Sequence, residues 1–156
     1  MKNATLSEAG VARYELEVVI DAPRERVWKA LTTQIDDWWL PAFHMVGEGS
    51  TISFGVEAGG QLIERIDGGA SLLWGTVQMV VPGESIHLVG FSHPEWGGPA
   101  TTLLRFGLEE RDGATAVTLT DAIHGRIDEG NLASVREGWQ ELLGNGLKAF
   151  VETGSI

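Results

Sequence analysis

The stretch DEGNLASVREGWQELLGNGLKAFV, residues 128–151, decides the fold of this chain because it has the pattern of a long amphipathic helix. Its apolar stripe repeats at intervals of three and four residues, the helical period, over Val135, Trp139, Leu142, Leu143, Gly146, Leu147 and Phe150. Glycine within a helix costs about 1 kcal/mol relative to alanine, so Gly138, Gly144 and Gly146 need a structural reason. Two hypotheses explain these glycines: they leave room for a cavity beneath the helix, or they allow the helix to approach the neighbouring sheet closely.

Most of the chain before this helix has the pattern of short strands joined by tight turns. Residues 13–21 alternate and are rich in β-forming residues, and residues 22–31 then form a helix with Pro23 at its favoured first position. A loop or short helix follows over residues 33–50. The remaining strands are predicted over residues 51–56, 61–66, 72–81, 85–92, 101–109 and 115–123. We therefore expect an α+β fold in which one antiparallel sheet of about six to seven strands wraps around the C-terminal helix.

The composition describes an ordinary globular domain with an acidic surface. With 156 residues, the chain is predicted to form a flexible leader over residues 1–12 and a single domain over residues 13–156. The net charge of −11 argues against nucleic acids and anionic membrane surfaces as partners, since no local cluster of Lys and Arg offsets it. The absence of cysteine, of a signal peptide and of a long apolar run leads us to expect a cytoplasmic protein.

Several short motifs follow one another in an order typical of one family. They are APRERVW at residues 22–28, WW at 38–39, GGQLIER at 59–65, WGTV at 74–77, and GW at 138–139 followed by Leu142 and Leu143. In these motifs the chain resembles the START-like or SRPBCC superfamily, and within it the branch named after the activator of the Hsp90 ATPase. The resemblance covers nearly the whole of residues 13–152. It implies a helix-grip fold, with one or two short helices after the first strand and a hydrophobic ligand cavity between the curved sheet and the C-terminal helix.

Strand alternation places two carboxylates on faces that otherwise read as buried. Glu64 shares a face with Leu62 and Ile66, and Asp121 shares a face with Leu119 and Ile123. Charged groups are rarely buried without a partner. Each carboxylate is therefore either a ligand anchor or acid/base group, or a structural group that accepts a hydrogen bond from a tryptophan N–H or forms an ion pair with an arginine.

The six tryptophans provide the candidates for the walls and the mouth of such a cavity. Trp38 and Trp39 lie in a loop and are the preferred candidates for a lid, with Trp96 as the second choice. The full set of predicted ligand-binding residues is Trp28, Trp38, Trp39, Phe54, Leu62, Glu64, Trp74, Val77, Leu104, Phe106, Asp121, Gly138, Trp139, Leu142 and Leu143.

Three functions are compatible with these residues. The first is the binding of a hydrophobic small molecule that is lipid-, polyketide- or aromatic-like. The second is an enzyme of the cyclase, dehydratase or hydrolase type that uses Glu64 or Asp121 as acid or base. The third, implied by the name of the family branch, is a co-chaperone-like interaction module. We expect a binding protein rather than an enzyme, assign no catalytic residue, metal or cofactor, and consider a homodimer compatible with the sequence.

Overall fold

The computed structural model describes residues 3–156 and contains seven strands and a C-terminal helical segment. The strands are β1 (Gly10–Ile20), β2 (Thr51–Phe54), β3 (Gln61–Arg65), β4 (Ser71–Val81), β5 (Ser85–Ser92), β6 (Ala100–Arg111) and β7 (Ala114–Gly125). The short helices are α1 (Arg24–Leu31), α2 (Ile35–Trp38), η1 (Pro41–Phe43) and η2 (Pro94–Trp96). The C-terminal segment consists of α3 (Glu129–Glu141), the π-helix η3 (Leu142–Lys148) and α4 (Ala149–Thr153).

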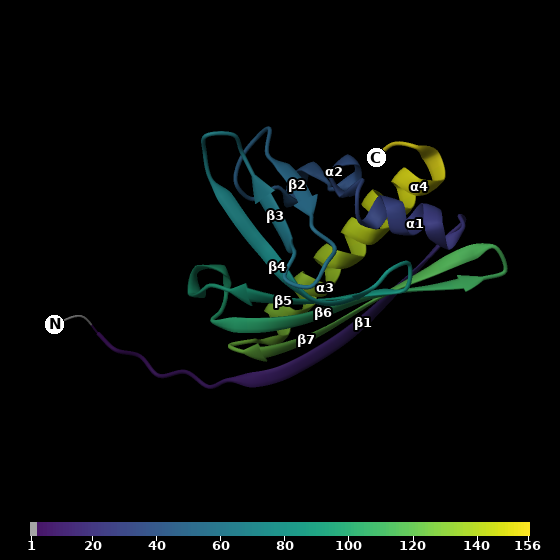
Figure 1. Cartoon of the computed structure of the whole chain (residues 1–156). Helices are drawn as coiled ribbons and strands as arrows, with labels where there is room; N and C mark the ends of the chain where they lie inside the picture. Colours follow the sequence, from purple (N-terminus) through teal and green to yellow (C-terminus); the bar gives the residue numbers. More distant parts are fainter. Residues whose placement is uncertain (1–2) are drawn as a thin grey trace.

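The strands form one antiparallel sheet in the order β1-β7-β6-β5-β4-β3-β2. Strands β2 to β7 are joined as a meander, and β1 forms one edge of the sheet by pairing with β7. The sheet curves around the C-terminal helices, which cross its concave side (Figure 1). This arrangement confirms the predicted α+β helix-grip fold, with the short helices α1 and α2 following β1.

The first strand begins earlier than its sequence pattern indicates. It was predicted over residues 13–21, whereas β1 starts at Gly10 and its first residues pair with His124 and Gly125 of β7. Residues 3–9 precede it without helix or strand. Pairing thus extends three residues into the segment that the sequence assigns to the leader.

The C-terminal segment is helical over the predicted range but is not one uniform α-helix. It begins at Asp128, whose side chain accepts a 2.7 Å hydrogen bond from the backbone N–H of Asn131. From Leu142 to Lys148 the helix widens to the π form before it returns to α4. Leu142, Leu143 and Leu147 are buried in the core from this wider part.

The glycines of this helix allow close packing against the segment that follows α1. A Cβ atom on Gly146 would lie 2.6 Å from the backbone oxygen of Trp38, and one on Gly138 would lie 3.3 Å from Cε1 of Phe43. For Gly138 and Gly146, close approach to a neighbouring segment is therefore the explanation rather than space for a cavity. The neighbour is the α2–η1 segment rather than the sheet, whereas Gly144 has no atom within 4 Å of such a Cβ position.

The core lies between the concave face of the sheet and the helices. Alternate residues of β6 and β7 point into it, including Leu104, Phe106, Leu119 and Ile123. The same alternation on β3 and β7 buries Glu64 and Asp121, as predicted from their parity. No helix within residues 3–156 is long and apolar enough to cross a membrane.

Candidate functional site

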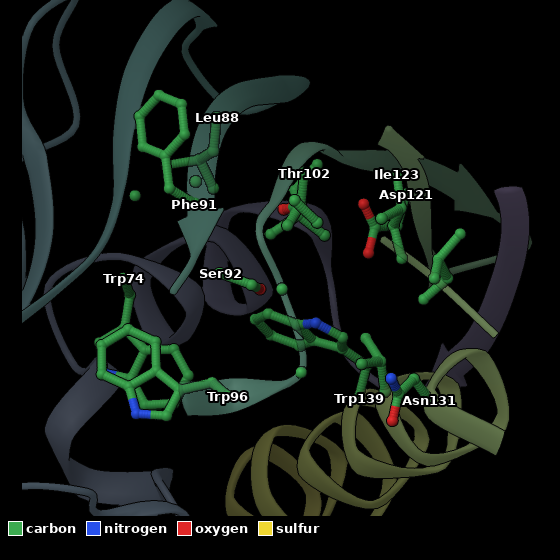
Figure 2. A pocket seen from close by; sticks show the side chains of 18 of the residues that line it. Trp74, Leu88, Phe91, Ser92, Trp96, Thr102, Asp121, Ile123, Asn131 and Trp139 are labelled. Atoms are coloured by element: carbon green, nitrogen blue, oxygen red, sulfur yellow. The ribbon is translucent and has the colours of Figure 1, made fainter. Parts of the chain in front are cut away.

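The candidate site lies where strands β4 and β5 separate. Strand β4 pairs with β5 only from Thr76 to Val81, while its first half pairs with β3. Beside the separated strands, η2 and the loop to Pro99 lead the chain from β5 to β6. A cavity of about 300 Å³ opens at this place between the sheet and α3 (Figure 2).

The walls of this cavity are apolar and come from both layers of the fold. The sheet and α3 together contribute Leu62, Leu72, Trp74, Leu88, Leu104, Ile123 and Trp139. Trp139 from α3 packs edge-on against Phe106, with ring centroids 5.7 Å apart, so the core fixes its ring. A concave, mostly apolar space with a few polar groups is the usual form of a small-molecule site.

The mouth of the cavity carries large apolar side chains that remain exposed to solvent. Phe91 at the end of β5 is 71% exposed and Trp96 in η2 is 58% exposed. Met45, Leu73 and Val135 are also exposed and line the same opening. Exposed apolar side chains gathered at one place, rather than scattered singly, are typical of a binding surface.

Asp121 is the buried acidic group of this cavity. Its side chain is 1% exposed, and its Oδ2 accepts a 2.9 Å hydrogen bond from the hydroxyl of Tyr14 on β1. Its Oδ1 accepts no hydrogen bond from any residue that the structure describes. The carboxylate lies on the cavity wall, with its oxygens directed toward Trp139 and Thr102 (Figure 2).

The burial of Asp121 changes how it titrates. Burial raises the pKa of its carboxyl group from 3.8 to about 6, although the hydrogen bond from Tyr14 acts in the opposite direction. Burial and the neighbouring carboxylate also raise the pKa of Tyr14, which therefore stays protonated and keeps donating. At neutral pH the site thus contains a largely ionised carboxylate with one neutral partner.

Other polar groups lie at the rim of the cavity. Ser92 and Thr102 contribute from the sheet side, and Asn131 and Ser134 contribute from α3. Arg126, between β7 and α3, also lines the cavity but is exposed and forms no ion pair with Asp121. These side chains can supply hydrogen bonds to a bound molecule without closing the space.

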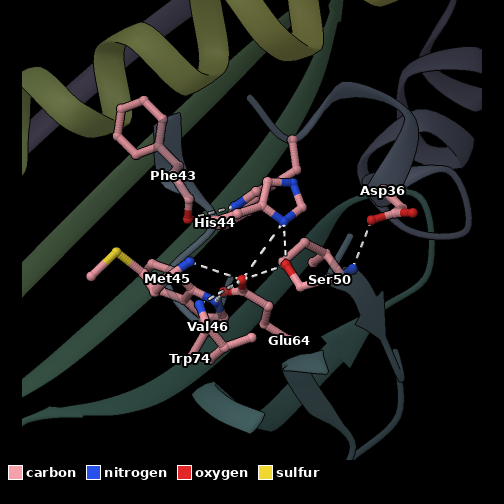
Figure 3. A network of polar contacts seen from close by, with 10 residues as sticks. Asp36, Phe43, His44, Met45, Val46, Ser50, Glu64 and Trp74 are labelled. Carbon is pink, nitrogen blue, oxygen red and sulfur yellow. Dashed lines mark hydrogen bonds and ion pairs between the residues drawn. The ribbon is translucent and has the colours of Figure 1, made fainter. Parts of the chain in front are cut away.

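Glu64 is fully buried and its hydrogen bonds are satisfied by the protein (Figure 3). Its Oε1 accepts hydrogen bonds from the backbone N–H groups of Met45 and Val46, at 2.8 and 3.1 Å, and from the hydroxyl of Ser50 at 2.7 Å. Its Oε2 accepts a 3.2 Å hydrogen bond from Nε1 of Trp74. Of the two predicted roles of Glu64, the structure shows the structural one, including the expected tryptophan N–H.

The electrostatics of Glu64 agree with this role. Burial alone would raise the pKa of the carboxyl group, but the hydrogen bonds from Ser50, Val46, Met45 and Trp74 outweigh burial and lower the pKa. Glu64 therefore remains ionised and holds the loop after η1 against β3. Through Trp74 it also fixes a ring that lines the cavity.

His44 and Ser50 lie beside Glu64 but do not form a catalytic triad. Nδ1 of His44 is 2.7 Å from the Ser50 hydroxyl oxygen and 3.6 Å from Oε1 of Glu64. The hydroxyl of Ser50 donates directly to the carboxylate of Glu64. In a catalytic triad the carboxylate would instead orient the histidine, and the histidine would accept from the serine. Across residues 3–156 no group of His, Asp and Glu side chains could hold a metal ion.

Trp38 and Trp39 are not at the mouth of the cavity, which corrects the prediction that they form its lid. Their side chains are 0% and 2% exposed, and their indole N–H groups donate to the backbone oxygens of Ala30 and Phe43. Trp39 instead packs behind the two cavity tryptophans, with its ring centroid 5.3 Å from that of Trp74 and 6.2 Å from that of Trp139. Trp96, the second choice, is the exposed tryptophan at the mouth.

The structure brings together only part of the predicted ligand-binding set. The cavity is lined by Leu62, Trp74, Leu104, Asp121 and Trp139. Outside its lining lie Trp28, Trp38, Trp39, Phe54, Glu64, Val77, Phe106, Gly138, Leu142 and Leu143. The contributions of Phe91, Ser92, Asn131 and Val135 to the lining were not predicted, although the sequence around Trp96, HPEWGGP at residues 93–99, is rich in Gly and Pro.

A family model and several solved structures match this chain over most of its length. A family model described as Activator of Hsp90 ATPase homolog 1-like protein matches residues 21–152. No curated protein matches the chain. Among solved structures, a protein of Rhizobium leguminosarum has a TM-score of 0.70 at 18% identity, covering 94% of this chain and 98% of its own.

Two further structures share the fold. A protein of Chromobacterium violaceum has a TM-score of 0.64 at 24% identity, covering 90% of this chain and 96% of its own. The Aha1 protein of Colwellia psychrerythraea, described as a dimer, has a TM-score of 0.63 at 23% identity, covering 92% of this chain and 98% of its own. At these identities the likeness concerns the fold alone.

Proposed function

The chain belongs to the family of Activator of Hsp90 ATPase homolog 1-like proteins, and from this premise we propose that it binds a hydrophobic small molecule in the cavity between β4–β7 and α3. The observation that carries the proposal is the combination, in one cavity of about 300 Å³, of apolar walls and one buried carboxylate. The exposed side chain of Trp96 at the mouth supports it, because a bound apolar molecule would cover it.

A neutral hydrophobic dye tests the proposal. N-phenyl-naphthylamine fluoresces strongly in apolar surroundings, so its emission should rise and shift to the blue when it is titrated with the protein. The variant Thr102→Phe adds a ring to the cavity wall, because the Thr102 side chain lines the cavity. It should weaken dye binding about fivefold or more, since forcing extra volume into a packed site costs about 1–3 kcal/mol.

The neighbouring residue offers a matched control. Leu103 follows Thr102 on the same strand, is half exposed and does not line the cavity. Leu103→Phe should therefore leave dye affinity unchanged within about twofold, which corresponds to less than about 0.5 kcal/mol. Equal loss of affinity in both variants, or no dye binding by the wild type, would contradict the proposal.

The enzyme hypothesis rests on one carboxylate rather than two. Asp121 faces the cavity with a raised pKa, as a general acid or base would. Glu64 is held by four donors away from the cavity lining, so it does not provide the second group of an acid/base pair. The binding hypothesis needs no second group and is preferred for this reason.

The co-chaperone hypothesis and self-association are tested separately. A co-chaperone should stimulate the ATPase of an Hsp90 chaperone in a coupled assay, and a lack of stimulation would remove that hypothesis. The dimeric relative from Colwellia supports homodimer formation by this chain. Light scattering after size-exclusion chromatography should then give twice the mass of one chain, and a single-chain mass would contradict it.

A further inference from the structure

We propose that the molecule bound in the cavity presents a hydrogen-bond donor to Oδ1 of Asp121, so that the site accepts apolar amines or alcohols and rejects apolar carboxylic acids. The inference rests on the proposed binding function and adds the chemical class of the ligand.

The two carboxylate oxygens of Asp121 differ in their hydrogen bonding. Oδ2 is occupied by the Tyr14 hydroxyl at 2.9 Å, whereas Oδ1 is buried and accepts nothing from the residues that the structure describes. A buried carboxylate oxygen without a donor costs about 1–3 kcal/mol or more, so buried acceptors are nearly always satisfied. A ligand donor at Oδ1 would remove this cost, and Asp121 is among the residues that line the cavity.

The titratable groups that the structure describes around the Asp121 carboxylate leave it without a charged partner. Tyr14 from β1 is neutral and already donates to the other oxygen. Arg126, which follows β7, is exposed at the rim, and Arg136 of α3 lies close enough to Tyr14 to act on its charge. Because an ionised carboxylate is only an acceptor, a ligand carboxylate placed there would meet like charge in a poorly hydrated site.

The size and the aromatic walls of the cavity also favour a small apolar ligand with a donor group. Trp74 and Trp139 line the cavity, and indole faces attract cations as well as apolar rings. The net charge of −11 also favours the approach of a cation over that of an anion. A volume of about 300 Å³ is at the lower end of drug-sized sites, which suits two fused rings with a short polar arm.

Four probes with one common skeleton test the inference. Naphthalene is used with a methyl, a hydroxymethyl, an aminomethyl or a carboxyl group at the same ring carbon, and binding to the full chain is measured near neutral pH by tryptophan fluorescence. The hydroxymethyl and aminomethyl probes distinguish a neutral donor from a cationic one. At least one of them should bind about tenfold or more tightly than the methyl probe, because hydrogen bonds to charged groups contribute about 1.5–3 kcal/mol. The carboxyl probe should bind most weakly.

The variant Asp121→Asn replaces the charged acceptor with an amide of nearly the same shape. It should lose the preference for the aminomethyl probe about tenfold or more and should tolerate the carboxyl probe better, since the repelling charge is gone. The exposed Asp67 provides the matched control, and Asp67→Asn should keep the wild-type order of affinities. Circular dichroism establishes that both variants are folded.

A measurement on the wild type does not depend on any variant. The carboxyl carbon resonance of Asp121, followed by NMR against pH, should titrate at lower pH with the aminomethyl probe bound than with the methyl probe bound. The same affinity order in wild type and Asp121→Asn, or an unchanged titration, would overturn the inference while leaving the binding function intact. Binding of none of the four probes would overturn both.

Discussion

The hydroxyl of Tyr14 lies 2.9 Å from Oδ2 of Asp121, and this hydrogen bond joins β1 to β7 beneath the cavity. The two residues are directly opposed in the β1–β7 register, so the strand pairing itself sets their distance. Each is buried, and each carries a polar group that the core would otherwise exclude. The pair therefore links the pairing of the edge strand β1 to the polarity of the candidate site.

Removing this donor should destabilise the fold in a pH-dependent manner. Tyr14→Phe leaves an ionised, buried carboxylate with no donor, so we expect a loss of about 1.5–3 kcal/mol in the free energy of unfolding near neutral pH. The pKa of Asp121 should rise above about 6, because the hydrogen bond that lowers it is gone. Urea unfolding at neutral and acidic pH measures the first effect, and NMR titration measures the second. An unchanged Asp121 titration would contradict the assigned hydrogen bond.

The raised pKa of Asp121 also predicts the direction of a pH effect on stability. The group binds its proton more tightly in the folded state, with a pKa of about 6 against 3.8. Its contribution is fully present below pH 3.8 and is lost as the pH rises through about 6, a change of about 3 kcal/mol. The variant Asp121→Asn should lack this component.

The measurement is the difference between two stability curves. Urea unfolding of wild type and Asp121→Asn from mildly acidic to neutral pH removes the contributions that both proteins share, including that of Glu64. The stability of the variant relative to wild type should increase as the pH rises. A constant difference across this range would show that Asp121 titrates normally.

Glu64 should behave in the opposite way because its pKa is lowered. Its stabilising contribution is present above its ordinary pKa of 4.5 and is lost as the pH falls through the lower folded value. Glu64→Gln removes the charge from four donors, one of which is the cavity residue Trp74, and should cost about 2–4 kcal/mol at neutral pH. Glu57→Gln, an exposed control, should cost less than about 0.5 kcal/mol. Equal midpoints of the two variants in urea would contradict the network.

Residue alternation was sufficient to predict the burial of Glu64 and Asp121 but not their different roles. The inward parity of both positions follows from the period of two in a strand, and both are buried. Glu64 is satisfied by donors from the loop over residues 44–50, whose irregular backbone has no period that a sequence pattern reveals. Which carboxylate faces the cavity is therefore decided by a loop rather than by the strands.

The prediction that Trp38 and Trp39 form a lid was wrong because it also depended on an irregular segment. The family motifs and periodic segments predicted the fold, because burial repeats along strands and helices. Trp38 and Trp39 lie between such segments, and their expected position in a loop led to the prediction that they form a lid. In the structure, the short helix α2 buries both, because each indole N–H finds a backbone acceptor nearby. Local acceptors of this kind cannot be read from the sequence.

The two tryptophan positions predict opposite effects of truncation. Trp39→Ala removes a buried ring from the core and should cost about 3–5 kcal/mol in the free energy of unfolding. Trp96→Ala removes an exposed ring at the mouth, so it should change stability by less than about 0.5 kcal/mol while weakening binding of N-phenyl-naphthylamine. Thermal unfolding and dye titration together separate these outcomes. Unaltered dye affinity in Trp96→Ala would exclude this ring from the ligand contact.

Two glycines of the π-helix offer the last test, since they differ only in what surrounds them. Gly146→Ala would place its Cβ 2.6 Å from the backbone oxygen of Trp38, and because backbone cannot move aside as a flexible side chain does, we expect a loss of about 1–3 kcal/mol. Gly144→Ala meets nothing within 4 Å and should gain up to about 1 kcal/mol through helix propensity. Urea unfolding of both variants measures the contrast. If Gly146→Ala were as stable as Gly144→Ala, the helix would not be held against α2 in the way described.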